Sequence, residues 1–328
     1  MNYSFLNSSI DEVSNSDVIN PFILKNCANE IKKAVEFLAS DNRILHIHGF
    51  LGTGKRQIIN YISNFTDINV IKLEYYCKVS TVSDDILLSF IDTLQKIYAK
   101  NIINNRISTL AVKFNQLVEE TQRPILIILH SLDDITEKNI QLVINMLESL
   151  ENQEQVKIII STRGIAQDIL GNKLQIDNRL FIKGFSKDIF KMFVEHSQMD
   201  YNEKTLENFY KCTRGYYYYT ALVFKIVKAM NITLNEFMEK YTLSGTNFDE
   251  YLGMTYVNLI PTAIRNFFWF LRTVRHGLSL NALAAFELYD EFSLEYLKTN
   301  LMIFIANEIV YVQDYFHQNI DISIPQKT

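Results

Sequence analysis

Short apolar runs alternate with amphipathic stretches along the first half of the chain. Five of these runs predict β-strands, and they lie at residues 44–48, 68–75, 124–129, 156–160 and 179–182. Between them, apolar residues recur at spacings of three and four, which predicts helices at residues 28–38, 84–103, 108–120 and 136–151. The third run is apolar on both faces, as in a buried parallel sheet. Strands that alternate with helices predict an α/β domain with a doubly wound parallel sheet and right-handed crossovers.

The second half of the chain is predicted to be helical, and the pattern changes after Gly184. Helical spacing recurs at residues 188–197, 203–213, 217–230, 234–243 and 248–256, and Ser186 is expected to cap the first of these helices. Pro261 opens a third block, with predicted helices at 263–274, 280–288 and 294–306 and strand-like runs at 308–312 and 320–324. Three helices followed by a hairpin is the order of a winged helix. We therefore expect a flexible lead-in at 1–19, a sheet domain at 20–184, a helical lid at 185–258 and a winged helix at 259–328.

A glycine-rich sequence, GFLGTGK at residues 49–55, follows the first predicted strand. It matches the phosphate-binding P-loop pattern G-x-x-x-x-G-K. The glycines let backbone N–H groups turn inward, the lysine places a positive charge near the β- and γ-phosphates, and the next helix directs its N-terminal dipole at the same anion. The sheet domain is thus predicted to bind ATP or ADP. The residues expected to contact the nucleotide here are Gly49, Gly52, Thr53, Gly54, Lys55, Arg56 and Gln57.

Arg56 departs from the P-loop pattern, which normally ends in Ser or Thr with a hydroxyl that binds magnesium. Two interpretations stay open: the guanidinium fills the site, or it adds a contact to a phosphate. In both, the hydroxyl ligand is missing. This weighs against a bound Mg²⁺ ion and leaves ATPase activity in question.

The end of the third predicted strand also departs from the ATPase pattern, which needs acidic residues there to hold magnesium and to polarise water. The apolar run ends at Leu129, so His130 and Ser131 take those places, and Asp133 and Asp134 follow three residues late. In the alternative register the two aspartates are the acidic motif, but His130 and Ser131 would then lie inside a buried strand, which is unfavourable. We prefer the first register. Asp133 and Asp134 remain the candidate catalytic residues, and Asp133 the candidate metal ligand.

Composition narrows the class of protein. The 328 residues are 48% apolar and 21% charged, as in a globular protein with a sizeable core. The net charge of −5 provides no overall attraction to nucleic acid or to anionic membranes. The three cysteines are far apart and lack metal-ligand spacing, which favours buried thiols in a reducing cytosol. No apolar run approaches the ~20 residues of a membrane span and no signal-peptide pattern is present, so we expect a cytoplasmic protein without membrane contact.

The order of these motifs resembles that of the AAA+/STAND ATPases, including the origin-recognition group. The features that carry the resemblance are, in chain order, Asn20-Pro21-Phe22, the P-loop, the acidic end of the third strand, Ser161-Thr162-Arg163, Lys183-Gly184-Phe185-Ser186, the helical lid and the winged helix. The resemblance implies that Arg163 senses the γ-phosphate, and a charged residue at the end of a central strand does sit where such sheets bind ligands. It also suggests Arg214 as a lid arginine that reaches the phosphates.

The lid departs from the family at Tyr217, which stands where STAND lids carry a proline that contacts adenine. Four consecutive tyrosines at residues 216–219 begin here. We expect them to pack between helices, and stacking on a nucleotide base is the alternative.

Residues 129–133, LHSLD, are similar to the degenerate motif of the second subunit of the eukaryotic origin recognition complex, a non-hydrolysing scaffold, as is GKR at 54–56. The implied function is a nucleotide-dependent switch or scaffold with weak or no hydrolysis, which acts on a protein partner or in self-assembly. Residues 251–328 carry five basic and seven acidic side chains, so we favour a protein contact over DNA for the winged helix. The alternatives are an origin-recognition-like DNA-binding subunit and an active ATPase that uses Asp133 or Asp134.

Overall fold

A computed structural model describes residues 19–318 of the chain, except 79, 99–108, 152, 164–175, 177, 275–276, 287–288 and 307. The chain forms two compact units that divide between Lys183 and Gly184. The expected lead-in at 1–19 lies outside the described residues, apart from Ile19.

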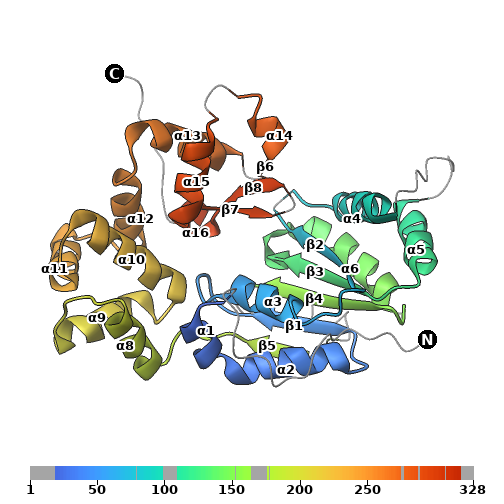
Figure 1. Ribbon diagram of the computed structural model, residues 1–328, viewed down its shortest axis with the longest axis horizontal. Coiled ribbons are helices and arrows are strands. Elements are labelled where there is room, and N and C mark those ends of the chain that lie inside the picture. Colours follow the sequence, from blue (N-terminus) through green and yellow to red (C-terminus); the bar gives the residue numbers. More distant parts are fainter. Residues whose placement is uncertain are drawn as a thin grey trace. The chain divides into compact units, whose positions relative to one another are not determined.

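The first unit is built on a five-stranded parallel sheet in the order β2-β3-β4-β1-β5 (Figure 1). The predicted α/β fold is confirmed, and each predicted strand is present, with its ends shifted by three residues at most. The strands are β1 (Ile44–His48), β2 (Ile71–Tyr76), β3 (Ile125–His130), β4 (Val156–Thr162) and β5 (Asn178–Phe181). β2 begins three residues later than expected because Asp67 closes a turn: its carbonyl accepts a hydrogen bond from Val70 N.

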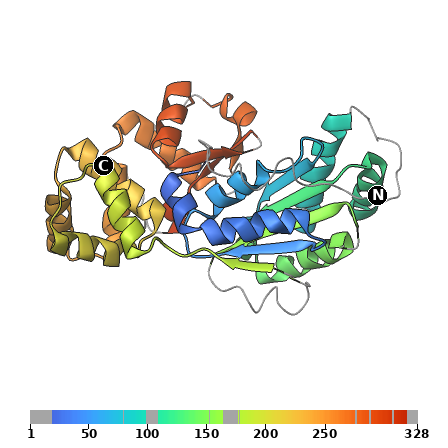
Figure 2. The same cartoon turned by 60° about the horizontal axis from the view of Figure 1, so that its bottom comes forward.

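Helices cover this sheet. They are α1 (Pro21–Asn26), α2 (Ala28–Ala39), α3 (Lys55–Ser63), α4 (Ser83–Tyr98), α5 (Leu110–Thr121) and α6 (Glu137–Glu151). Alternate residues of β3 and β4, such as Ile127 and Ile158, share a buried core with Phe90 of α4, Phe114 of α5 and Leu147 of α6. Helix α2 runs alongside β1 and β5 (Figure 2).

Lys157 is a buried lysine near the start of β4, next to the core residue Ile158. Its ammonium donates hydrogen bonds to the carbonyl oxygens of Phe37, Ser40 and Asn42, at 3.0, 2.6 and 2.8 Å. These carbonyls lie at and just beyond the C-terminal end of α2, where backbone acceptors lack helical partners and the helix dipole favours a cation. The lysine therefore ties α2 to the strand that leads into Arg163.

The second unit begins with five helices, as the sequence predicts. They are α8 (Lys187–His196), α9 (Glu203–Thr213), α10 (Tyr217–Met230), α11 (Leu234–Ser244) and α12 (Phe248–Asn258). Ser186 is the N-cap of α8, and its hydroxyl accepts a hydrogen bond from Ile189 N at 3.3 Å, as expected. These helices form the helical lid.

The winged helix follows in the same unit. Its elements are α13 (Thr262–Thr273), β6 (Leu278–Ser279), α14 (Leu280–Leu283), α15 (Glu291–Thr299), β7 (Ile303–Ala306), β8 (Ile309–Val312) and α16 (Asp314–Gln318). The three strands form an antiparallel sheet in the order β6-β8-β7. No helix among the described residues is long and apolar enough to cross a membrane.

The sequence prediction was wrong for the last part of this module. The predicted helix at 294–306 ends at Thr299, and residues 303–306 form β7 instead. Leu301 adopts a left-handed conformation with φ of 60°, which ends the helix, and the β-branched residues that follow suit a strand. The hairpin therefore pairs 303–306 with 309–312. The run at 320–324 lies outside the described residues.

The four consecutive tyrosines pack within the second unit. Tyr216 and Tyr219 are buried, and Tyr217 packs against the rings of Phe185 and Phe193. The Tyr218 hydroxyl donates a hydrogen bond to the carbonyl oxygen of Leu301 at 2.6 Å. Packing between elements is thus what these rings do, and Tyr217 contacts two phenylalanine rings.

Candidate nucleotide-binding site

The P-loop connects β1 to α3, and its glycines stand where a side chain would clash with a neighbour or strain the backbone. Gly54 is the N-cap of α3 with φ of 96°, and a Cβ there would lie 2.8 Å from Ile23 Cδ1. A Cβ on Gly49 would lie 2.3 Å from the Ile182 carbonyl oxygen, at the end of β5. Gly52 also has a positive φ, of 82°. Only glycine fits these positions without strain, because of the backbone conformation of the loop and because α1 and the end of β5 pack close against it.

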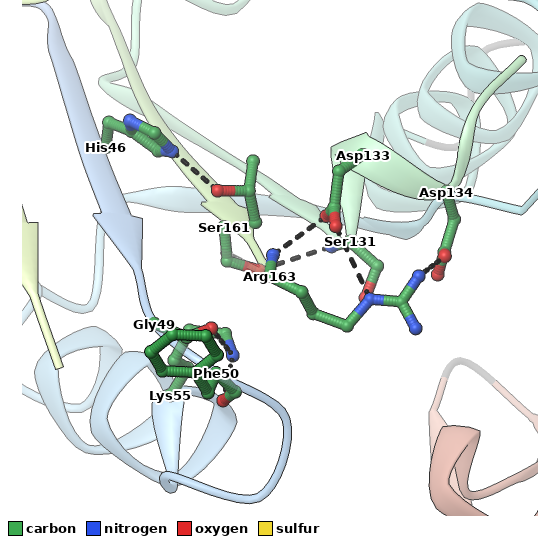
Figure 3. A network of polar contacts seen from close by, with 10 residues as sticks. His46, Gly49, Phe50, Lys55, Ser131, Asp133, Asp134, Ser161 and Arg163 are labelled. Carbon is green, nitrogen blue, oxygen red and sulfur yellow. Dashed lines mark hydrogen bonds and ion pairs between the residues drawn. The ribbon is translucent and has the colours of Figure 1, made fainter. Parts of the chain in front are cut away.

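Lys55 is the first residue of α3, and its ammonium lies over the loop (Figure 3). Its Nζ donates hydrogen bonds to the carbonyl oxygens of Gly49 at 2.7 Å and Phe50 at 2.9 Å. The buried hydroxyl of Thr53 also donates to the Phe50 carbonyl oxygen, at 2.9 Å. The loop thus presents a cation and a helix N-terminus together, the donor set that suits a phosphate group.

Gln57, which the sequence assigns to the nucleotide, holds the preceding segment in place. Its Oε1 accepts a hydrogen bond from Asn20 N at 3.1 Å. The Asn20 side chain in turn caps α1 by accepting from Phe22 N at 3.0 Å. Gln57 therefore fixes α1 beside the P-loop, which is where Ile23 meets Gly54.

His130 ends β3 and is paired with Glu74, a residue of β2 that the sequence analysis did not single out. His130 Nε2 lies 2.6 Å from Glu74 Oε1, and the Tyr76 hydroxyl donates to the same oxygen at 3.0 Å. The rings of Tyr76 and His130 stack with centroids 4.3 Å apart. The sequence signal was an acidic residue within a predicted strand, and it does not reveal the partner because Glu74 is 56 residues from His130.

The charges of this pair follow from burial and from hydrogen bonding. Burial acts to raise the pKa of Glu74, but the hydrogen bonds from His130 and from the Tyr76 hydroxyl lower it on balance. Burial lowers the pKa of His130 despite its contact with Glu74. An ionised Glu74 can only accept, so Nε2 of a neutral His130 carries the proton and donates it to the carboxylate.

Arg56 acts on this pair electrostatically. Its positive charge lowers the pKa of both Glu74 and His130. The residue that replaces the usual P-loop hydroxyl is thus a cation near the partly buried carboxylate of Glu74 in β2. Lys55 and Arg56 are consecutive, so the start of α3 carries two positive charges at the loop.

Arg163 follows β4 and is held by both aspartates that the sequence analysis selected (Figure 3). Its backbone N donates to Asp133 Oδ1 at 2.9 Å, and its Nε lies 3.4 Å from Asp133 Oδ2. Its terminal nitrogen forms an ion pair with Asp134. The β3 end is held to β4 as well, since Ser131 N donates to Ser161 Oγ at 3.2 Å. The structure therefore brings Arg163, Asp133 and Asp134 into one cluster.

Arg214 belongs to the second unit. It is the exposed C-cap of α9, in a left-handed conformation with φ of 54°. Burial raises the pKa of Asp249, and the charge of Arg214 opposes that rise. The contacts shown for Arg214 are thus with its own unit.

The residues at this edge of the sheet do not fit a magnesium ion. Arg56 stands where a hydroxyl ligand is needed, His130 is committed to Glu74, and the two aspartates are paired with Arg163. In the part of the chain that the structure describes, no group of three or more His, Cys, Asp or Glu residues is arranged to hold a metal ion. The glycine turn, Lys55 and the N-terminus of α3, by contrast, have the arrangement expected of a P-loop.

No protein-family model and no curated protein sequence matches the chain. Among solved structures, it is similar to a STAND protein with a tetratricopeptide repeat sensor from Pyrococcus horikoshii, with 14% identity, a TM-score of 0.57, and coverage of 89% of this chain and 42% of that one. A Walker-type ATPase of Pyrococcus abyssi has 13% identity, a TM-score of 0.48, and coverage of 88% and 93%. The ORC1 protein of Aeropyrum pernix, solved in complex with DNA, has 10% identity, a TM-score of 0.48, and coverage of 88% and 89%.

The likeness to the STAND protein shows the fold, and it agrees with the expectation from the sequence. The chain has the P-loop fold of AAA+/STAND ATPases, with a parallel-sheet domain, a helical lid and a C-terminal winged helix. It spans 42% of the length of that STAND protein.

Proposed function

We propose that this protein binds ATP or ADP at its P-loop, hydrolyses it slowly or not at all, and acts as a nucleotide-dependent switch or scaffold. One observation carries the proposal. The P-loop keeps its phosphate-binding lysine and glycine turn, whereas the positions that would hold magnesium and activate water are replaced or engaged in ion pairs.

Binding is supported by the geometry of Lys55. Its ammonium lies within 2.9 Å of two carbonyl oxygens of the loop, so it is already placed over the turn. A bound phosphate gains a lysine charge, inward backbone N–H groups and the N-terminus of α3. The site residues proposed on this basis are Gly49, Gly52, Thr53, Gly54, Lys55 and Arg56.

Slow or absent hydrolysis follows from the surrounding side chains. Phosphoryl transfer relies on positioned charge and on a residue that orients the attacking water. Asp133 and Asp134 satisfy the guanidinium of Arg163 instead, and His130 donates to Glu74. An active ATPase would have to break these contacts first.

The lid, residues 185–258, and the winged helix, residues 259–328, are proposed to be the elements that respond to the nucleotide. Tyr218 and Tyr256 of the lid helices donate hydrogen bonds to the Leu301 and Asn300 carbonyl oxygens of the winged helix, at 2.6 and 2.5 Å. These contacts support movement of the lid and the winged helix together. The partner is then a protein or another copy of this chain.

The alternative of a DNA-binding subunit is less well supported by α15, the helix in the recognition position. It exposes Glu291 and Glu295, and its Lys298 is 3.2 Å from the carboxylate of Glu295. DNA binding requires a basic surface, since phosphate contacts dominate affinity.

The proposal is tested by isothermal titration of the full chain with ATP and ADP, with magnesium and with EDTA. We expect micromolar binding that magnesium changes by less than about threefold and that Lys55→Ala weakens by about 100-fold, in line with the loss of a charge-assisted contact. Lys32→Ala, which removes an exposed lysine of α2, is the matched control and should change nothing. Absence of binding would overturn the proposal, and so would magnesium-dependent turnover on the order of 1 s⁻¹ that Lys55→Ala abolishes.

A further inference from the structure

The cluster of Arg163, Asp133 and Asp134 holds two carboxylates against one guanidinium. The side chains are 19%, 16% and 14% exposed, so water screens them only in part. The guanidinium is satisfied from two sides, by Asp133 and by Asp134. The cluster as a whole therefore carries one net negative charge, and the charge of Arg163 is already neutralised.

This acidic cluster lies beside the P-loop. β1 and β4 are neighbouring parallel strands, with His48 paired to Thr162, so Gly49 and Arg163 leave the sheet at the same level. Neighbouring strands are about 4.8 Å apart. On the other side of β1, the Ile182 carbonyl oxygen of the β5 end closes against Gly49. A phosphate chain that extends past the loop would therefore lie above the C-terminal ends of β4 and β3, because the β5 side is closed.

A P-loop cradles the α- and β-phosphates of its nucleotide, so we expect the third phosphate of a nucleoside triphosphate to be the one that extends past the loop. It adds negative charge next to the acid pair, and the residues present do not fit a magnesium ion that would neutralise it. In Figure 3 the guanidinium of Arg163 turns toward Asp133 and Asp134, with Gly49 and Lys55 on the other side of its backbone. If Arg163 turned to the phosphate instead, two half-buried carboxylates would lose their cation beside a new anion, which is unfavourable.

We infer that this site selects nucleoside diphosphates over triphosphates, and that Asp133 and Asp134 are the residues that determine this specificity. The inference rests on the proposed nucleotide binding at the P-loop. The diphosphate needs only the loop, Lys55 and the N-terminus of α3, which the acid pair does not touch.

The test compares ADP and ATP affinities by isothermal titration in EDTA. The wild-type chain should bind ADP at least about tenfold more tightly than ATP. The double variant Asp133→Asn/Asp134→Asn removes both negative charges. The amide oxygens can still accept hydrogen bonds from Arg163, but its guanidinium charge is no longer neutralised and can pair with a phosphate. ATP should then bind about tenfold more tightly than before, and ADP affinity should change by less than about twofold.

A matched control removes two carboxylates from the opposite edge of the sheet. Asp41 precedes β1 and Glu154 precedes β4, and both are exposed. Asp41→Asn/Glu154→Gln should leave the ADP-to-ATP preference unchanged. The unchanged ADP affinity of the Asp133/Asp134 variant serves as its folding control.

Each outcome decides between the two proposals. Equal wild-type affinities for ADP and ATP would overturn the specificity inference while the proposed nucleotide binding stands. A double variant that shifts both affinities equally would do the same. If the wild-type chain binds neither nucleotide, the proposed function itself fails.

Discussion

His46 is a buried histidine in β1 whose protonation state depends on its surroundings. Its Nε2 lies 2.9 Å from Thr162 Oγ1, and its ring stacks on that of His48 with centroids 5.2 Å apart. Burial, together with the charges of His48 and Arg179, lowers the pKa of His46 to about 4. The ring is thus neutral in the folded chain at every pH where an unfolded histidine begins to take up a proton.

This lowered pKa predicts a loss of stability in mild acid. The unfolded chain binds a proton at His46 near pH 6.5 and the folded chain near pH 4, so the contribution is complete above pH 6.5 and falls by about 3 kcal/mol as the pH drops to 4. Hydrogen exchange of the β1 amides should show this slope, and His46→Gln should reduce it. Burial of His130 acts in the same direction, so the slope should not vanish.

Another histidine provides the control for this measurement. His196, at the exposed end of α8, can be changed to Gln without affecting β1. If His46→Gln and His196→Gln leave the same pH slope, His46 does not carry the effect.

The carbonyl groups that follow α15 receive their hydrogen-bond donors from other helices. A helix leaves its final carbonyl groups without helical partners. Here the Tyr256 hydroxyl of α12 donates to the Asn300 carbonyl at 2.5 Å, and Tyr218 of α10 donates to that of Leu301 at 2.6 Å. In the opposite direction, the hydroxyl of Tyr315 in α16 donates to the carbonyl oxygen of Asp249 in the lid helix α12, at 2.6 Å. The end of α15 thus depends on two lid helices.

We predict that Tyr218→Phe/Tyr256→Phe destabilises the winged helix by about 2–3 kcal/mol, because two partly buried carbonyl groups lose their donors. Trp269 in α13 is the one tryptophan of the chain, so its fluorescence during urea unfolding reports on this module. Tyr201→Phe, which removes a hydroxyl that contacts Glu195 at the surface, should change stability by less than about 0.5 kcal/mol. Similar losses in both variants would argue against a special role for the lid tyrosines.

At the scale of the whole molecule, charge bears most directly on the choice of partner. The net charge is −5, and residues 251–328 have more acidic than basic side chains. In the described part of the winged helix, the exposed carboxylates of α15 stand where a DNA-binding protein would place basic residues. This distribution favours a protein contact.

We therefore predict that the chain binds duplex DNA with a Kd weaker than about 10⁻⁴ M at physiological salt, measured by fluorescence anisotropy. Glu291→Lys/Glu295→Lys reverses two charges on α15 and should create weak binding that disappears as salt is added. Tight wild-type binding with a steep salt dependence would contradict the prediction and revive the origin-recognition alternative.

Much of this architecture could be predicted from local patterns along the chain. Apolar runs located the five parallel strands, and the signal is clearest for β1, β3 and β4, which are buried on both faces. The P-loop could be recognised because its glycines and lysine form a short motif. The backbone conformation of the loop requires glycine within that motif, as the φ of 96° at Gly54 shows. The departures from the ATPase pattern at Arg56 and His130 could be seen as well, because both positions belong to short motifs.

Contacts between distant segments could not be read from those patterns. Glu74 meets His130 only because the sheet places β2 next to β3, and Arg163 meets Asp133 and Asp134 because β4 lies on the other side of β3. The helix predicted to continue to residue 306 stops at Thr299, where its carbonyls turn to lid tyrosines more than 40 residues away. Local spacing encodes which face of a segment is buried, whereas partners for buried charges and helix ends exist only once strands and helices are packed together.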